Sequence, residues 1–102
     1  MTDDLVIDGD AGTITIAAAV VGGLVRAAAE GVAGTRVRRR RRGVDVTFDD
    51  GRAHVQLELA ARYGAVLPEL ARTVQEDVSA ALAEACDVEV AAVDVAIEEL
   101  DD

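Results

Sequence analysis

The chain has 102 residues, of which 51% are hydrophobic but only 2% aromatic, and its formal net charge is −10. This length suffices for one hydrophobic core but not for two ordinary domains, so we expect residues 1–102 to form a single domain. All basic residues are arginine, which excludes mechanisms that need a lysine, such as Schiff-base formation.

The N-terminal region predicts an extension followed by a strand. We expect residues 1–11 to be a flexible N-terminus that runs into a turn formed by Asp8 to Gly12. Thr13 to Ile16 alternate polar with β-branched residues, which predicts a short strand. The N-terminus lacks the basic start of a secretory signal, and the single cysteine, Cys86, cannot form an intramolecular disulfide, so we expect a cytoplasmic location.

The next segment predicts a helix that is apolar nearly all round. From Ala17 to Glu30 apolar residues recur at helical spacing, and Gly31 suits the left-handed cap that ends a helix. Only two residues of this helix are charged, so it must be covered on more than one side. The cover is either the sheet, with the alanines tolerating exposure, or a partner molecule. In the second case Val21 and Val25 are candidate partner-binding residues.

The middle of the chain predicts two hairpins. Segments 35–40 and 44–48 have strand-like content. The apolar residue of the first segment has an odd number and those of the second have even numbers, so one unbroken strand would turn them to opposite faces. A turn or bulge near Gly43 is therefore required. We interpret these segments as a hairpin whose arginine-rich tip projects into solvent. Asp49 to Arg52 then form a tight turn, and residues 53–63 alternate regularly, which predicts the longest strand.

The last third predicts a second helix and a final strand. Pro68 suits the first turn of a helix, and a continuous apolar stripe runs from Leu67 to Ala85. We expect the opposite face, which includes Gln75, to meet water. Residues 88–100 read as a strand in which a change of parity predicts a bulge at residues 91–92.

Together these elements predict a two-layer α+β fold. The expected architecture is an antiparallel-rich sheet of about four to five strands with two helices on one face, in the order β-α-β-β(-β)-α-β. The longest apolar run, Ile16 to Val25, is too short to span a bilayer, which takes about 20 residues. We therefore expect no transmembrane segment.

No arrangement of residues indicates catalysis. A nucleophilic triad would have to use Ser79 or Cys86 with His54. Ser79 lies within a predicted helix, and Cys86 lies at a helix C-terminus, where the helix dipole disfavours a thiolate. His54 is expected to point outward and has no companion ligand for a metal ion. We therefore expect no catalytic residue, no metal and no cofactor.

The arginine run is the one feature with an unusual local charge. Six arginines fall within seven residues of an otherwise acidic chain, so positive charge is concentrated in one short segment. They suit an acidic protein partner, including another copy, a nucleic acid or an anionic lipid, or they only protect a strand edge from aggregation. Nucleic acid is disfavoured because no aromatic residue lies among the arginines. The residues nominated for partner binding are Arg36, Arg38, Arg39, Arg40, Arg41 and Arg42.

Several segments resemble the alkaline shock protein family of bacterial envelope stress response proteins. They are Gly12 to Ile16, Glu30 to Val32, Tyr63-Gly64, Leu67 to Ala71 and Val74-Gln75. The resemblance implies a small α/β domain without known catalytic activity, often cytoplasmic, sometimes held at the membrane by a partner protein, and inclined to self-associate. The positions most typical of the family are Gly31, Val32, Tyr63, Gly64, Pro68 and Gln75.

The leading functional hypothesis is a non-catalytic, self-associating scaffold or adaptor in cell-envelope homeostasis. Its expected partners are proteins, namely further copies of itself and a membrane-anchored protein. Self-association would join the arginine hairpin of one copy to the acidic C-terminal strand of another. The alternative is a binder of nucleic acid or another anionic surface through the same hairpin, and an enzyme acting through Cys86 or His54 is a third hypothesis.

Overall fold

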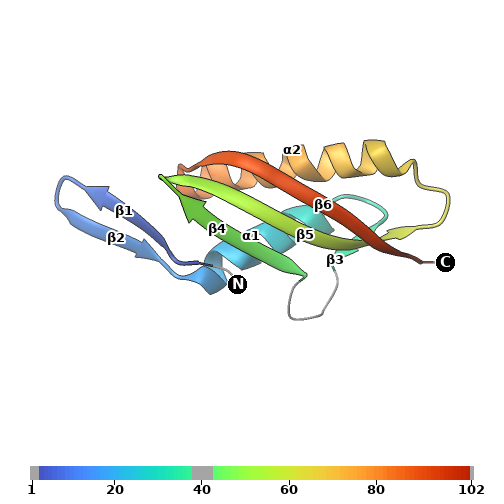
Figure 1. The fold of residues 1–102 in the computed structure, drawn as a ribbon, viewed down its shortest axis with the longest axis horizontal. Helices are drawn as coiled ribbons and strands as arrows, with labels where there is room; N and C mark the ends of the chain where they lie inside the picture. Colours follow the sequence, from blue (N-terminus) through green and yellow to red (C-terminus); the bar gives the residue numbers. More distant parts are fainter. Residues whose placement is uncertain (1–2, 38–42, 102) are drawn as a thin grey trace.

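The computed structural model describes residues 3–37 and 43–101. Two helices lie over one face of a four-stranded sheet, and a separate two-stranded hairpin extends from one end, as Figure 1 shows. The two-layer α+β prediction is confirmed. In chain order the elements are β1 (Leu5–Gly9), β2 (Gly12–Ile16), α1 (Ala18–Glu30), β3 (Thr35–Val37), β4 (Val44–Asp49), β5 (Arg52–Arg62), α2 (Leu67–Cys86) and β6 (Glu89–Asp101).

Strand β5 is the centre of the larger sheet. β6 pairs in parallel with β5 along residues 52–62, so both β3 and β4 lie on the remaining side. There β3 pairs antiparallel with residues 59–61 and β4 with residues 52–57. β3 and β4 therefore follow one another along β5 instead of pairing with each other. The expected arginine-tipped hairpin around Gly43 is wrong, and Arg38 to Arg42 lie outside the described residues.

The β4–β5 turn and the first β6 bulge are confirmed. Asp50 and Gly51 both have positive φ, 53° and 76°, as the tight turn between β4 and β5 requires. The β6 register moves from Val90 to Ala92 across consecutive β5 residues, so Ala91 is the extra residue. A second register shift, opposite Leu59 and Ala60, was not predicted.

The N-terminal residues form part of a hairpin arm. We expected an extension through residue 11, whereas the structure places Leu5–Gly9 in β1, paired antiparallel with β2. Leu5 is buried, and Ile7 and Ile16 pack against the core, so the base of the arm is held by apolar contacts. Ile14, farther along the arm, is 54% exposed.

The ends of α1 depart from the prediction. The carboxylate of Asp4 accepts a hydrogen bond from the Ala18 N–H at 2.6 Å, which satisfies a donor of the first turn from outside the helix. Gly31 has φ −71°, so the expected left-handed cap at this residue is wrong. The left-handed conformation occurs instead at Gly34, φ 89°, directly before β3.

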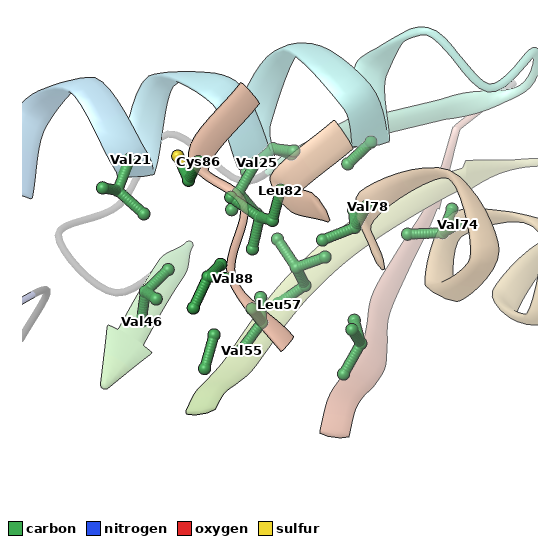
Figure 2. Close-up of a cluster of buried hydrophobic side chains, with 14 of the residues drawn as sticks. Val21, Val25, Val46, Val55, Leu57, Val74, Val78, Leu82, Cys86 and Val88 are labelled. Atoms are coloured by element: carbon green, nitrogen blue, oxygen red, sulfur yellow. The ribbon is translucent and has the colours of Figure 1, made fainter. Parts of the chain in front are cut away.

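The core lies between the two helices and the inner face of the sheet and consists mainly of aliphatic side chains, together with Cys86 (Figure 2). Val21 and Val25, nominated as partner-binding residues, are fully buried there, so this nomination is corrected. The exposed large apolar side chain of α1 is Val20, at 54%. The fully buried side chains with the largest volumes are Leu57, Leu59, Leu82, Val21, Val25, Val37, Val46, Val55, Val74 and Val78.

Candidate interaction surfaces

The residues considered for catalysis are not brought together. Cys86 is buried at the end of α2, and burial raises the pKa of its thiol, which keeps it protonated and unreactive. His54 is exposed on β5, where its side chain lies on the face of the sheet turned away from the helices. Among residues 3–37 and 43–101, no group of three or more His, Cys, Asp or Glu converges as metal ligands.

The outer face of the sheet is polar. On β5 exposed residues alternate with residues buried beneath the helices. Arg52 Nη2 lies 3.1 Å from Glu89 Oε1, and His54 Nε2 lies 2.7 Å from Asp94 Oδ2. All four side chains are largely exposed, and such pairs contribute at most about 1 kcal/mol each. The described residues that project from this face of β5 are therefore mainly polar.

The free side of β3 is occupied by its own chain. The Thr35 N–H donates to the Val32 carbonyl at 3.2 Å, and the Val37 N–H donates to Glu30 Oε2 at 3.3 Å. Both bonds use groups at or just after the C-terminal end of α1. A strand from another molecule would have to displace them to pair with β3.

The free side of β4 is occupied by Asp3. The Asp3 N–H donates to the Val46 carbonyl at 2.9 Å, and Asp3 Oδ2 accepts from the Phe48 N–H at 3.4 Å. A single residue, which precedes the hairpin arm in the sequence, thus bonds to two outward-facing backbone groups of β4. This side of the sheet is accordingly covered at Thr35 and Val37 in β3 and at Val46 and Phe48 in β4.

The free side of β6 is closed only near its start. Gln75 Nε2, from α2, donates to the Val93 carbonyl at 3.0 Å. Alternate residues of a parallel strand turn their backbone groups to the same side, so Val95 and Ile97 also face away from β5. Within the described part of the chain, no hydrogen bond reaches the outward backbone groups of these two residues. We call the stretch Val95 to Ile97 the open edge.

Charge is distributed unequally between the two sides of the sheet. β6 carries Glu89, Asp94, Glu98, Glu99 and Asp101 and no basic residue. The opposite side carries Arg36 in β3, and the sequence places Arg38 to Arg42 between the ends of β3 and β4. β5 lies between these two sides, so the acidic strand β6 and the strand β3, which carries Arg36, occupy opposite edges of one sheet.

Several of the family-typical residues contribute to the fold itself. Gln75, expected to face water, instead bonds to Val93 and is partly buried. Gly64 has φ 90°, which lets the chain leave β5, and Pro68 lies in the first turn of α2. Val32 is buried, with 8% of its surface exposed, whereas Tyr63 is 59% exposed.

The residues that close the sheet edges were missed by sequence reasoning. Asp3, Glu30 and Gln75 each bond to a strand through a contact that depends on the folded chain, between residues 45, 7 and 18 positions apart. No local sequence pattern marks a carboxylate or amide that covers a strand edge, because every residue except proline offers the same backbone groups as partners. The only available signal was that Gln75 belongs to a family-typical segment.

These observations define a class: a small two-layer α+β domain in which residues 3–37 and 43–101 hold no group of three or more potential metal ligands and whose sheet edges are covered to different extents. A model of the alkaline shock protein 23 family, described by a cell envelope-related function, matches residues 6–101. The chain belongs to this family, which confirms the resemblance. No curated protein sequence matches the chain.

Solved structures agree in fold. The MamM CTD in a copper form superposes with a TM-score of 0.55 and 17% identity, covering 79% of this chain and 95% of that one. A zinc form gives a TM-score of 0.52 and 19% identity, covering 79% of this chain and 84% of that one. At this identity the likeness concerns the fold alone. In the described part of the chain, neither helix has the length and apolar character needed to cross a membrane.

Proposed function

We propose that this protein is a non-catalytic scaffold or adaptor of the bacterial cell envelope that self-associates through unlike charges. The family supplies the setting, a cell envelope-related function. The observation that supports self-association is that β6, with its acidic residues, and β3, which carries Arg36 and precedes the arginine run in the sequence, lie on opposite sides of β5.

This placement favours contact between molecules over contact within one. β6 pairs with the whole length of β5 and thereby lies two strands away from β3 and β4. Neighbouring strands are spaced about 4.8 Å apart, so the outer sides of the two edge strands face away from each other. The arginine run that follows β3 in the sequence is therefore proposed to meet the acidic strand of another copy.

An interface of this kind has predictable properties. It joins two different surfaces, so each copy in a pair keeps one surface unused and further copies can add. Attraction between exposed charges falls as salt shortens the Debye length from about 10 Å at 0.1 M to about 3 Å at 1 M. Self-association should therefore weaken steeply with ionic strength. A membrane-anchored protein with a basic or acidic segment could use the same surfaces, which is the adaptor part of the proposal.

Sedimentation velocity tests the proposal. The wild-type chain is expected to sediment as oligomers at about 50 mM salt and as a monomer at about 500 mM salt. Serine replacements at Arg38 to Arg42 should give a monomer at both. A matched control replaces the arginines outside the run, Arg26, Arg52, Arg62 and Arg72, and should retain salt-sensitive oligomers. A wild-type monomer at low salt and high concentration would contradict the proposal.

The alternative, a binder of nucleic acid or another anionic surface, makes a different prediction. Arginines that bind phosphates would give a gel shift with RNA or DNA, or sedimentation with acidic vesicles, that weakens linearly on a log–log plot against salt. The acidic total charge opposes such binding. A shift at about 50 mM salt that is lost on replacing Arg38 to Arg42 would favour this alternative over the scaffold.

A further inference from the structure

Among the described residues, the hairpin arm of β1 and β2 is a sheet of its own that projects from one end of the molecule (Figure 1). One face of the arm continues the core, since Leu5 is buried and Ile7 and Ile16 pack against the core. Ile14 lies opposite Ile7 on the same face and is 54% exposed. A two-stranded hairpin is marginally stable at best in water, whereas three or more strands with an apolar face are stable. The arm would therefore be stabilised by a further strand beside it.

The outer edge of β2 offers the backbone groups that such a strand needs. Gly9 and Gly12 close a two-residue turn, and the pair that closes such a turn exchanges both of its hydrogen bonds. Pairs with and without mutual hydrogen bonds alternate from there, so Thr13 and Thr15 turn their N–H and C=O groups away from β1. Residues 12–15 are exposed, and in the described part of the chain no hydrogen bond reaches these outward groups. An unpaired edge of this kind is a template for another strand.

Charge decides which edge two copies of this acidic chain can share. Residues 11–25 carry no charge, so β2 can lie beside another β2 without repulsion. The open edge of β6 is flanked by Asp94 and Glu98, and pairing two copies there would bring like charges together, which is destabilising. β1 carries Asp8 and follows two further acids, so the same objection applies to its edge. β2 is therefore the edge that a second copy can approach most easily.

The sequence of β2 also matches itself. In an antiparallel pair of two copies centred on Ile14, Thr13 of each copy lies opposite Thr15 of the other, and their outward backbone groups meet. Opposed threonines and opposed β-branched residues are cross-strand pairs that stabilise a sheet. The two Ile14 side chains lie next to each other on the apolar face, which then continues across four strands. The edge thus fits a second copy in its side chains as well as in its backbone.

We propose that β2 pairs antiparallel with β2 of a second copy, so that two arms form one four-stranded sheet about a twofold axis. This contact goes beyond the charge-driven self-association, because it uses neither β6 nor the arginine run. It joins the same surface of both copies and therefore closes at two. Its area is small beside the roughly 1,200 Å² that stable complexes bury. The arms accordingly pair at near-millimolar concentration, as inside an assembly already held by charge, and separate in the dilute solutions used for sedimentation.

Disulfide cross-linking tests the contact at its central pair. Opposite residues without mutual hydrogen bonds have Cα atoms about 4.5 Å apart, a distance that a disulfide spans, so Ile14→Cys should link two paired copies. Val6→Cys is the matched control, because Val6 is 59% exposed on the other strand of the arm. Both variants are oxidised with copper phenanthroline at near-millimolar concentration in about 500 mM salt, where the charged interface dissociates. Cys86 is buried, and mass spectrometry identifies the linked peptides.

Intrinsic reactivity is removed from the comparison. Each cross-linking rate is divided by the rate at which the same cysteine reacts with iodoacetamide, a neutral reagent. Thr15→Pro added to Ile14→Cys removes an outward N–H of β2 without removing a bond to β1. Thr15→Val in the same background keeps the N–H and controls for the loss of the threonine side chain.

The expected result is selective linking at position 14. Ile14→Cys should link at least about tenfold faster than Val6→Cys, because thiols held side by side have an effective concentration far above that of the free chains. Thr15→Pro should lower the rate to that of Val6→Cys, and Thr15→Val should leave it unchanged. Amide exchange of the wild-type chain needs no substitution: the Thr13 and Thr15 amides should slow about twofold when half of the chains are paired, while the Ile14 amide should not.

Three results would overturn the inference. Equal normalised rates for Ile14→Cys and Val6→Cys would mean that the arms meet only by collision. Linking at about 50 mM salt that is lost at about 500 mM would mean that the charges, and not the strand edges, bring the arms together. Fast linking that Thr15→Pro does not slow would mean contact without strand pairing. The charge-driven self-association fails separately, if the wild-type chain sediments as a monomer at low salt.

Discussion

Replacing Gln75 by glutamate tests how the sheet edge is closed. Gln75 Nε2 donates to the Val93 carbonyl at 3.0 Å, and the two residues join α2 to the one edge strand that has an open stretch. Glutamate has nearly the same shape but, when ionised, only accepts hydrogen bonds. The substitution therefore removes the donor and places a carboxylate against a carbonyl while leaving the packing of α2 unchanged.

The expected loss of stability follows from this one bond. A net hydrogen bond contributes about 0.5–1.5 kcal/mol, and an uncompensated polar contact adds to the loss, so Gln75→Glu should lower the free energy of unfolding by about 1–3 kcal/mol. For a domain of this size, 1 kcal/mol corresponds to about 4–8 °C in Tm. Urea unfolding at neutral pH measures the loss.

The pH dependence identifies the cause. A protonated glutamic acid donates a hydrogen bond, so the deficit relative to wild type should narrow as the pH falls below about 4. Ala80→Glu, at an exposed position of α2, adds the same charge without touching β6 and serves as the matched control. A Gln75→Glu variant as stable as Ala80→Glu at neutral pH, or a deficit that does not narrow in acid, would refute the assigned role.

Three further substitutions test other parts of the structure. Leu57→Ala should cost about 2–5 kcal/mol in urea unfolding, because Leu57 is only 2% exposed in the core. Glu30→Ala removes the acceptor of the Val37 N–H and should speed exchange of that amide, with a loss of about 1 kcal/mol. Burial raises the pKa of the Cys86 thiol, so the folded state holds this proton more tightly than the unfolded chain does. This stabilisation is complete at pH values below 9.0, the ordinary pKa of a cysteine thiol, and is lost as the pH rises above it. Between about pH 8 and 10, the wild type should therefore lose more stability than Cys86→Ala.

Elements with one buried face were predictable from the sequence. β5 and α2 each bury one face on the core, so their apolar residues recur with periods of two and 3.6. The turn at Asp50-Gly51 and the bulge at Ala91 were also predicted, because local backbone geometry restricts the residue types that fit and a bulge shifts the alternation. In these cases the information is local.

Features that depend on contacts between distant residues were not predictable. The parity change near Gly43 indicates an interruption, but it does not distinguish a hairpin from two strands that follow one another along β5. Val21 and Val25 belong to a helix that is apolar nearly all round, and only the packing of α1 shows which residues face the core. The bonds of Asp3 and Gln75 to backbone groups likewise exist only in the folded chain.

The most direct test of the central claim mixes two copies that lack opposite halves of the interface. One carries serine at residues 38–42, and the other carries Glu98→Gln, Glu99→Gln and Asp101→Asn on β6. At about 50 mM salt each variant alone should sediment as a monomer, and an equimolar mixture should sediment as a one-to-one complex that dissociates at about 500 mM salt. Oligomers formed by either variant alone, or a mixture that remains monomeric, would contradict the account.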